Sequence, residues 1–510
     1  MNISNNIKKR TIAVLGLGLT GKSIVNYFNN SGNNLICWDD NIAKRNQLTN
    51  QNIKIHDLSD PNIWSNIDLL LISPGIPYLY PNAHPAVIQA LNNSVRIDND
   101  IGLFFEDLEK KKKNTTIICV TGSNGKSTTV SLINHVLLNF KKNSEVGGNI
   151  GRPVLELNTD ESNTFKVLEL SSYQIEIAKF LSPDIAIFLN LSSDHLDRHG
   201  GIGGYFNSKA RLFYNGMPKY SIINVDQPEG KYLANYLEQS ANFDTKVIHI
   251  SSKKIINRSN WSISLINGSI IERKNGIELF RSNISDFINL PGDHNLMNAC
   301  IAYAACKLFQ KSPLEILNKM KNFKALPHRS AFVRKIKDVT FINDSKATNM
   351  DSALKSISAY DRIRWIVGGQ KKEGDYFQIQ PYEEKIKKIY IIGNTAKELS
   401  KLFEGLKNSI CINLKKAVHQ AYRDSEPGDT ILLAPGCASF DQFKNFEDRG
   451  EKFCEIVDKG LQKVPQQVGL KLPKLQKVGT MLYLIGTIIA LKVIEKTTEW
   501  DGFICVSGCF

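Results

Sequence analysis

The sequence lacks the cysteine spacing, the leader and the compositional bias that mark several classes of protein. Its nine cysteines include no CxxC pair, which predicts thiols in a reducing compartment rather than disulfides. No apolar stretch opens the chain, so we expect no signal peptide and a cytoplasmic protein. With 42% hydrophobic and 22% charged residues, 34 glycines, 17 prolines and no internal repeat, disordered and collagen-like chains are excluded. Cysteines with apolar neighbours, expected in the core, are Cys37, Cys119, Cys300, Cys306 and Cys411.

The chain is basic, with a net charge of +14. Such an excess suggests polyanionic partners: nucleic acid, an anionic membrane or phosphorylated small molecules. However, the charges are scattered, and the clearest run, Lys110–Lys113, has no aromatic residues interleaved. We therefore expect no nucleic-acid partner and interpret the run as a solvated linker.

Short apolar runs alternate with helical patterns through most of the 510 residues. This alternation predicts an α/β fold of about three domains with mostly parallel sheets. Changes of pattern predict domains over 1–112, 113–326 and 327–460, followed by a tail over 461–510. The predicted strands are Thr11–Leu15, Leu35–Trp38, Leu69–Ile72, Thr116–Val120, Val167–Leu170, Ile185–Leu189, Trp365–Val367, Ile389–Ile392 and Thr430–Leu433.

The tail differs from the rest of the chain, since it is first Lys-rich and then apolar over Val478–Ile494. At 17 residues this run is at the lower limit for a membrane span. A helix packed on the body, a peripheral membrane anchor and an extension of the reading frame remain as alternatives.

The first chemical motif is the glycine-rich turn Gly16–Gly21, which directly follows the first predicted strand. Glycines at a strand–helix turn let a diphosphate approach the backbone, and the helix N-terminus stabilises its charge. Asp39, 18 residues further on, could hold a ribose or a base edge. The motif alone leaves open a dinucleotide cofactor, another nucleotide and a tight turn without a ligand.

A second motif, Thr121–Thr128, has the sequence Thr-Gly-Ser-Asn-Gly-Lys-Ser-Thr between a predicted strand and a helix. It departs from the strict phosphate-loop pattern, but the chemistry is retained. Backbone N–H groups would surround phosphates, Lys126 would reach the β- and γ-phosphates, and Ser127 would bind Mg²⁺. The motif therefore predicts a nucleoside triphosphate site.

Polar residues follow two further strands. Glu169 ends one of them, and Asp194–His199 follows the next. Strand ends in a parallel sheet meet at one edge, so these side chains would lie beside the phosphate loop. A carboxylate suits Mg²⁺, a zinc site is an alternative, and simple capping of the strands is a third.

Taken together, the motifs resemble the Mur ligase family of peptidoglycan synthesis over residues 10–458. Two further segments, Asn343–Asn349 and Cys437–Phe446, resemble the members that add D-glutamate to UDP-N-acetylmuramoyl-L-alanine. The other segments that carry the resemblance are Gly16–Gly21, Ser73–Gly75, Thr121–Thr128, Gly147–Gly151 and Leu168–Gln174.

The resemblance implies a Rossmann-like N-terminal domain for the UDP-substrate, a central phosphate-loop ATPase domain and a Rossmann-like C-terminal domain that binds the amino acid. The implied enzyme is a monomeric, ATP-dependent ligase. Phosphoryl transfer makes an acyl phosphate, which the amine of D-glutamate then attacks. Gly16–Gly21 would accordingly bind UDP rather than a dinucleotide cofactor.

The resemblance also assigns residues. For ATP it implies Gly122, Ser123, Asn124, Gly125, Lys126, Ser127, Thr128, Asn295, Asn298, Arg329, Asp344 and Lys346. For the UDP-substrate it implies Gly18, Leu19, Thr20, Asp39, Ser73, Pro74, Gly75, Asn149 and His195. For D-glutamate it implies Thr348, Lys372, Ser439 and Phe446. The implied catalytic residues are Lys126, Glu169, His195 and Lys209, and the implied ligands of two Mg²⁺ ions are Ser127, Glu169, His195 and Lys209.

Lys209 has this role only as a carbamate. Read by itself, it would be a surface lysine of a helix. Two departures leave details open, since Asp40 adds a negative charge near the UDP site and Lys371 could replace Lys372. Two rival functions remain: a ligase of the same fold with another substrate, and a nucleotide-binding protein without turnover. Any membrane contact would come from the tail.

Overall fold

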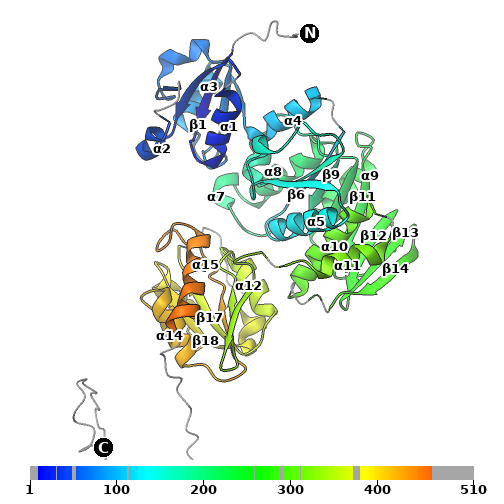
Figure 1. Ribbon diagram of the computed structural model, residues 1–510, viewed down its shortest axis with the longest axis vertical. Helices are drawn as coiled ribbons and strands as arrows, with labels where there is room; N and C mark the ends of the chain where they lie inside the picture. Colours follow the sequence, from blue (N-terminus) through cyan, green and yellow to red (C-terminus); the bar gives the residue numbers. More distant parts are fainter. Residues whose placement is uncertain are drawn as a thin grey trace, which may run out of the picture. The chain divides into compact units, whose positions relative to one another are not determined.

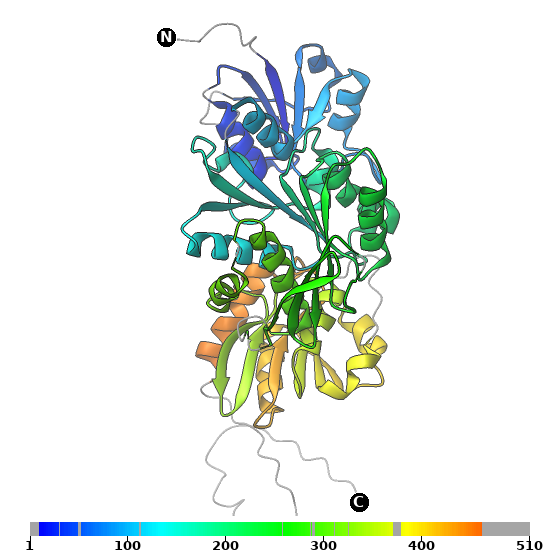
Figure 2. The same cartoon turned by 90° about the vertical axis from the view of Figure 1, so that its right-hand side faces the viewer.

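The computed structural model contains three β-sheets, each with helices packed on its faces (Figures 1 and 2). It describes residues 10–461, which belong to one unit of the chain, with internal gaps. The residues left out are 1–9, 30, 49–52, 112–113, 258, 286, 288–290, 311, 325, 371–378 and 462–510. The predicted α/β fold with mostly parallel sheets is confirmed.

The first sheet has five parallel strands in the order β3-β2-β1-β4-β5. Along β1, Ile12 and Val14 pack on one face, and Ala13 and Leu15 on the other. This alternation buries both faces of the sheet under helices. The elements are β1 Thr11–Leu15, α1 Leu19–Asn29, β2 Asn34–Trp38, α2 Ile42–Asn46, β3 Lys54–Ile55, β4 Leu69–Ile72, α3 Pro85–Asn92 and β5 Arg96–Asp98.

The second sheet has nine strands in the order β14-β13-β12-β11-β10-β9-β6-β8-β7. Strands β6 to β12 run parallel to one another. Strands β12, β13 and β14 form an antiparallel edge that the sequence patterns did not predict. The strands are β6 Thr115–Thr121, β7 Asn143–Gly148, β8 Thr164–Glu169, β9 Ile185–Phe188, β10 Tyr220–Asn224, β11 Lys246–Ser251, β12 Trp261–Ile266, β13 Ser269–Lys274 and β14 Ile277–Asn283.

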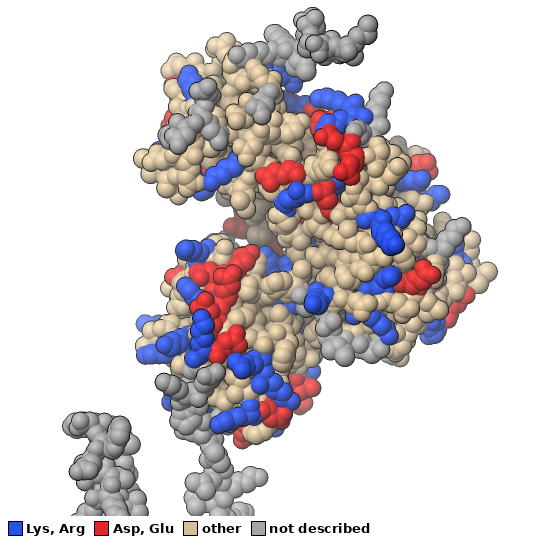
Figure 3. Space-filling model, viewed as in Figure 1, with Lys and Arg blue, Asp and Glu red and all other residues tan. Residues whose placement is uncertain are grey.

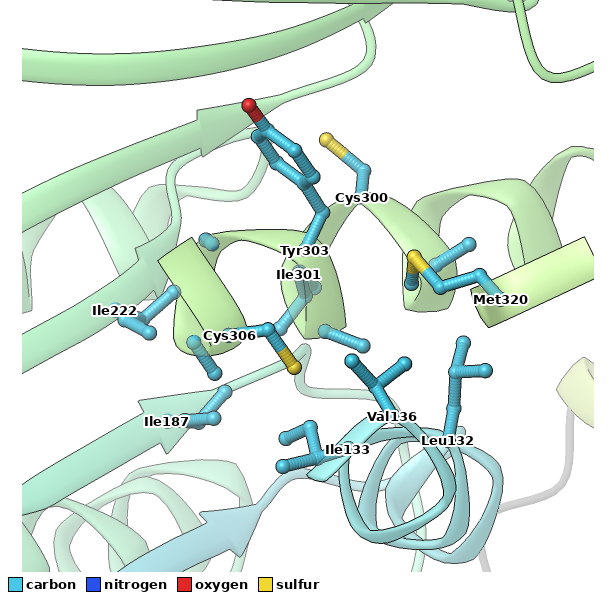
Figure 4. Packing of buried hydrophobic residues seen from close by; sticks show 14 of the residues in the cluster. Leu132, Ile133, Val136, Ile187, Ile222, Cys300, Ile301, Tyr303, Cys306 and Met320 are labelled. Atoms are coloured by element: carbon cyan, nitrogen blue, oxygen red, sulfur yellow. The ribbon is translucent and has the colours of Figure 1, made fainter. Parts of the chain in front are cut away.

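Helices cover both faces of this central sheet. On one face α5 packs against α10 through Ile133, Val136 and Ile301 (Figure 4). On the other face Phe104 and Phe105 of α4 join the core, although the predicted limits place α4 in the first domain. The helices are α4 Asp100–Lys111, α5 Lys126–Asn139, α6 Ser172–Ile177, α7 Leu196–His199, α8 Ile202–Tyr214, α9 Pro228–Gln239, α10 Asp293–Lys307 and α11 Pro313–Lys321.

The third sheet has six strands in the order β15-β16-β20-β17-β18-β19, of which only β15 runs antiparallel to its neighbour. Trp365 and Val367 face one helical layer, and Ile366 faces the other. The elements are β15 Ala331–Ile336, β16 Val339–Asn343, α12 Met350–Ser358, β17 Ile363–Gly368, β18 Ile386–Ile392, α13 Ala396–Leu402, β19 Asn408–Ile410, α14 Leu414–Arg423, β20 Thr430–Leu433 and α15 Phe446–Glu455.

All nine predicted strands are present, each within three residues of its predicted limits. The five cysteines expected in the core are buried free thiols; burial raises the pKa of Cys37 to about 12. The boundary between residues 112 and 113 lies outside the described residues, so the domain limits stay predictions.

Basic and acidic side chains are interspersed over the face of the molecule in Figure 3, rather than separated into single-sign areas. The run Lys110–Lys113 is described only as far as Lys111, whose ammonium pairs with Asp107 at 2.9 Å and Asp160 at 3.5 Å. On this face, therefore, the excess positive charge does not form one basic patch.

Helix α5 offers a matched pair of leucines for testing the core. Leu137 is fully buried, whereas its neighbour Leu138 is 49% exposed. We expect Leu137→Ala to reduce the free energy of unfolding by about 3 kcal/mol, because it leaves a cavity in a packed core. Leu138→Ala should cost less than about 1 kcal/mol. Thermal unfolding of both variants measures the difference, and equal melting temperatures would contradict the assigned face of α5.

Candidate active site

The phosphate loop connects β6 to α5 and has a conformation that two glycines allow. Gly125 precedes α5 with a φ of +88°, and a Cβ there would lie 2.4 Å from Asn298 Oδ1. At Gly122, with a φ of +150°, a Cβ would lie 2.8 Å from the Leu189 side chain. Any larger residue at either position would displace a neighbour, so the sequence fixes the loop tightly against α10 and β9.

The side chain of Lys126 turns back over this loop. Its ammonium donates to the carbonyl oxygens of Gly122 and Ser123, both at 2.8 Å. The charge is thus held at the start of α5, where the helix dipole already favours an anion. This is the placement that the phosphate-loop motif predicts.

A buried carboxylate lies beside the loop. Glu169, at the end of β8, is 2% exposed and accepts hydrogen bonds from Ser127 Oγ and, at 2.8 Å, from Asn149 Nδ2. The structure therefore brings three predicted site residues from different segments into one polar cluster. Each of them offers an oxygen atom.

Two cations reach this cluster from residues 327–349. Arg329 Nη2 lies 2.5 Å from Ser127 Oγ, and the Lys346 ammonium lies 3.7 Å from the centre of the Phe446 ring. Burial is the largest influence on both and lowers the pKa of Arg329 and that of Lys346, the latter to about 8 with a further contribution from the charge of Arg329. Both groups thus carry positive charge into a desolvated site.

Lys209 is 1% exposed, so the interpretation of this residue as a surface lysine is wrong. Its amine donates to the Gly122 carbonyl at 3.0 Å and lies over the Tyr205 ring at 4.3 Å. Burial, and then the charge of Lys126, hold the pKa of Lys209 well below its ordinary value. The neutral amine form of Lys209 is therefore favoured far more than it is in an exposed lysine.

His195 begins the short helix α7 with a left-handed φ of +56°. Its Nε2 lies 3.6 Å from Asp194 Oδ2, and its ring lies 5.0 Å from that of Tyr173. The side chain faces the same cavity as Glu169.

A cavity of about 460 Å³ unites these groups. Its walls come from the central sheet, from α10 and from the segments around 343–349 and 437–446. The predicted residues that line it are Ser123, Asn124, Gly125, Lys126, Ser127, Thr128, Asn149, Glu169, His195, Asn295, Asn298, Arg329, Asp344, Lys346, Thr348, Ser439 and Phe446. Two predicted residues are not in the lining of the cavity: Gly122, which belongs to the phosphate loop, and Lys209, which donates to its carbonyl.

The predicted UDP-substrate residues of the first sheet form a separate cluster. Gly16 has a φ of +89°, and Ser73 Oγ donates to its carbonyl at 2.8 Å. Asp39 accepts hydrogen bonds from the backbone of Leu17 at 2.7 Å and Asn41 at 2.9 Å. Although its burial acts to raise the pKa of Asp39, these bonds and the nearby Lys44 lower it.

This cluster places the turn next to the loop that begins at Ser73. None of Gly18, Leu19, Thr20, Asp39, Ser73, Pro74 and Gly75, all of them described, lines the cavity. Asp40 lies 3.2 Å from His84 Nε2 and accepts a hydrogen bond from Trp38 Nε1 at 3.1 Å, so its largely exposed carboxylate is hydrogen-bonded within the fold.

Sequence motifs missed part of the cavity wall. Asp194 and Asn349 stand inside segments already singled out, and His294 directly precedes Asn295; their position there was the only signal. Ser352 and Lys355 of α12 belong to no motif and are brought in by the fold alone.

The donor set suits a hard cation that keeps water and phosphate ligands. Within the described part of the chain, no group of three or more His, Cys, Asp or Glu side chains could hold a metal ion. Mg²⁺ is commonly bound through one or two carboxylates plus substrate phosphates, whereas zinc needs several nitrogen or sulfur ligands. Glu169 with Ser127 therefore fits Mg²⁺, and the alternative of a zinc site loses support.

Comparison with known proteins covers most of the chain. The Mur ligase MurD-like N-terminal domain matches residues 10–98, the Mur ligase middle domain 120–306, and the Mur ligase glutamate ligase domain 328–437. A protein of Cereibacter sphaeroides named UDP-N-acetylmuramoylalanine--D-glutamate ligase is 42% identical over 88% of this chain and 98% of its own length. The chain belongs to the Mur ligase family. A protein of the same name from Dinoroseobacter shibae is 44% identical, again over 88% and 98%.

Solved structures of Mur ligases have the same fold as this chain. UDP-N-acetylmuramate-alanine ligase from Thermotoga maritima superposes with a TM-score of 0.55 at 17% identity, over 88% of this chain and 99% of the other. MurF from Acinetobacter baumannii gives 0.52 at 18% identity, over 78% and 92%. The three-domain Mur ligase fold predicted from the motifs is therefore confirmed, as are the family and its ATP-dependent ligase chemistry.

Two of the predictions made from the sequence lie outside the described residues. These are the pair Lys371 and Lys372, and the tail with its apolar run over 478–494. Among the helices that the structure does describe, none is long and apolar enough to cross a membrane.

Lys346 allows a test of the site's electrostatics without any ligand. Its pKa falls from 10.5 to about 8 on folding, so below pH 8 both states are protonated and the folded state bears the full desolvation cost. We expect Lys346→Met to be more stable than the wild type by about 3 kcal/mol below pH 8. That advantage should shrink between pH 8 and 10.5, where only the unfolded wild type still binds the proton. Urea unfolding at pH 7 and 9.5 measures it, and a pH-independent difference would contradict the burial of this charge.

Proposed function

We propose that the chain joins D-glutamate to UDP-N-acetylmuramoyl-L-alanine with hydrolysis of ATP to ADP and phosphate. The observation that carries this proposal is the meeting of the segments 343–349 and 437–446 with the phosphate loop in one cavity. The names of relatives aligned over nearly their whole length support it. In this proposal residues 1–112 bind the UDP-substrate, 113–326 bind ATP, and 327–460 bind the amino acid.

ATP would lie with its phosphates on the loop before α5. Lys126 would neutralise charge on the transferred phosphoryl group, while Arg329 and Lys346 would face the same phosphates from the third domain. Asn295, Asn298 and Asp344 would complete the nucleotide site, because they line the cavity beside the loop. Catalysis then consists of positioning and charge neutralisation, as in other phosphoryl transfers.

Ser127, Glu169 and His195, with Lys209 as a carbamate, would hold two Mg²⁺ ions. The ions would supply compensation for the negative charge of the triphosphate. Glu169 is suited to this role because it is a buried carboxylate whose two oxygens already accept two hydrogen bonds. Asn149, which donates one of these bonds, would orient it.

The substrate carboxylate attacks the γ-phosphorus, ADP leaves, and an acyl phosphate forms. The amine of D-glutamate then adds to the acyl carbon, and phosphate leaves from the tetrahedral intermediate. Thr348, Ser439 and Phe446 would bind D-glutamate beside the loop, with Lys372 as the partner of a carboxylate. Asn149 and His195 would contact the muramoyl part, and Gly18, Leu19, Thr20, Asp39 and Ser73–Gly75 would contact UDP.

We further propose a cytoplasmic monomer. The support is the set of described cysteines, all of which are free thiols, and the use of ATP. Any membrane contact would come from the tail.

The substrate assignment is tested by omission. Phosphate release should require ATP, UDP-N-acetylmuramoyl-L-alanine and D-glutamate together, and leaving out any one should remove it. Better turnover with meso-diaminopimelate, lysine or L-alanine in place of D-glutamate would assign the chain to another ligase. Absence of turnover with every combination would favour the nucleotide-binding protein without activity.

A second experiment tests whether Lys209 forms a carbamate. The ammonium would first lose one proton, and the free amine would then add to carbon dioxide, forming the N–C bond and releasing a second proton, so that a cation becomes an anion. Wild-type protein equilibrated with ¹³C-bicarbonate should show a carbamate carbon signal that Lys209→Ala lacks and that Lys231→Ala, an exposed lysine of α9, retains.

Lys209→Ala should lose at least about 3 kcal/mol of transition-state stabilisation, roughly a hundredfold in rate. Acetate should restore part of the activity by occupying the vacated space. Normal turnover of Lys209→Ala or of Lys209→Arg would show that no carbamate is needed.

A further inference from the structure

The phosphate loop is hydrogen-bonded to a helix of the third sheet. Asn124 Nδ2 donates to Asp351 Oδ2 at 2.6 Å, and Ser352 Oγ donates to Asn124 Oδ1 at 2.6 Å. Asp351 and Ser352 form the first turn of α12. One amide therefore makes two short contacts to residues more than 220 positions away.

The remaining polar groups of Asn124 also have partners inside the protein. Its backbone N–H donates to Asn190 Oδ1 at 2.9 Å, and its carbonyl accepts from Asn190 Nδ2 at 3.0 Å. Its Nδ2 also donates to Ser192 Oγ at 3.2 Å. Because an amide has two N–H donors, those of Asn124 are both used without a nucleotide.

A second contact holds the same end of α12. Asn349 caps the helix, since its Oδ1 accepts from the Ser352 backbone at 2.9 Å. Its Nδ2 donates to Asp194 Oδ2 at 3.2 Å, next to His195. The start of α12 is thus joined both to the phosphate loop and to the loop that carries His195.

These contacts determine where the preceding residues lie. Lys346 and Thr348 come immediately before Asn349 and face the cavity. An amine that reacts with an acyl phosphate must be presented at a defined distance, and errors of about 1 Å can cost a hundredfold in rate. Some contact must therefore fix the segment 343–349 relative to the phosphate loop.

We propose that Asn124, Asp351 and Ser352 are positioning residues that set this distance, and that Asn124 holds α12 rather than the nucleotide. The inference rests on the proposed function for its kinetic consequence but not for the contact itself. It replaces the nucleotide-binding role that the motif assigned to the Asn124 side chain. Lys355, which donates to Asp351 Oδ2 at 2.7 Å, holds the carboxylate in place.

A double-mutant cycle tests the kinetic part. Ser352→Ala should lower kcat/KM for D-glutamate about tenfold, and Asn124→Ala at least as much, because it also removes the bond to Asp351. The double variant should be little worse than Asn124→Ala, which already removes the contact of Ser352 Oγ with the loop. The dissociation constant of a non-hydrolysable ATP analogue should stay within about twofold of the wild type. Ser358→Ala is the matched control, since among the described residues its hydroxyl bonds only to Lys355 O within α12, at 2.7 Å.

Reversing the polarity gives a rescue. Asn124→Asp alone should be the worst variant, because it sets two carboxylates against each other. Adding Asp351→Asn should recover several-fold of the loss, since the new amide can donate to the new carboxylate.

Hydrogen exchange gives a readout that needs no turnover. Amides at the start of α12 should exchange at least fivefold faster in Asn124→Ala and at the wild-type rate in Ser358→Ala. Unchanged exchange in Asn124→Ala overturns the proposal, even if the substrate assignment fails. Multiplicative kinetic losses also overturn it, as does a loss of ATP-analogue affinity in Asn124→Ala that Ser352→Ala does not share. Failure of the wild type to release phosphate with D-glutamate would instead concern only the proposed function.

Discussion

Burying the carboxylate of Glu169 at the end of β8 costs free energy that hydrogen bonds and nearby cations must offset. Two hydrogen bonds come from Ser127 and Asn149, so the phosphate loop and the loop after β7 are both held to β8. Arg329 reaches the same cluster through Ser127. One charge at a strand end therefore organises three segments that are far apart in the sequence.

The same cavity is lined by the cations Lys126, Arg329 and Lys346 and by further carboxylates, those of Asp194, Asp344 and Glu447. The charge of Glu169 acts to raise the pKa of Lys209, Arg329 and Lys346, yet burial lowers all three. Cations that are desolvated in this way gain from a ligand that brings several negative charges to them. The triphosphate of ATP is such a ligand, so the electrostatics and the family chemistry point the same way.

Much of this arrangement could be predicted from the sequence, for reasons that differ between elements. The buried parallel strands are continuous apolar runs, so β1, β4 and β20 were located with their exact limits. The polar groups at strand ends follow from the geometry of parallel sheets. The antiparallel edge of β12, β13 and β14 was missed, because its pattern is short and one of its strands is largely exposed.

The burial of Lys209 and the role of α12 could not be predicted in this way. A lysine on an amphipathic helix normally faces water, and only the packing of α8 under the phosphate loop decides otherwise. Asp351 and Ser352 belong to no motif, since what matters is their distance from Asn124 in the folded chain. Residues that form contacts between domains are not spaced in a regular pattern along the sequence. Periodicity therefore predicts the strands of each sheet but not the contacts between the sheets.

A buried guanidinium holds the segments around 343–349 and 437–446 in shape. Arg449 of α15 is completely buried, and burial lowers its pKa to about 10. It donates to the carbonyl oxygens of Ser345 at 2.9 Å and Cys437 at 3.1 Å, and to Ser345 Oγ at 3.0 Å. A guanidinium with several fixed donors can join two loops at once, which a lysine cannot do. The segments around 343–349 and 437–446 are thus tied to each other by Arg449, and α12 ties the pair to the phosphate loop.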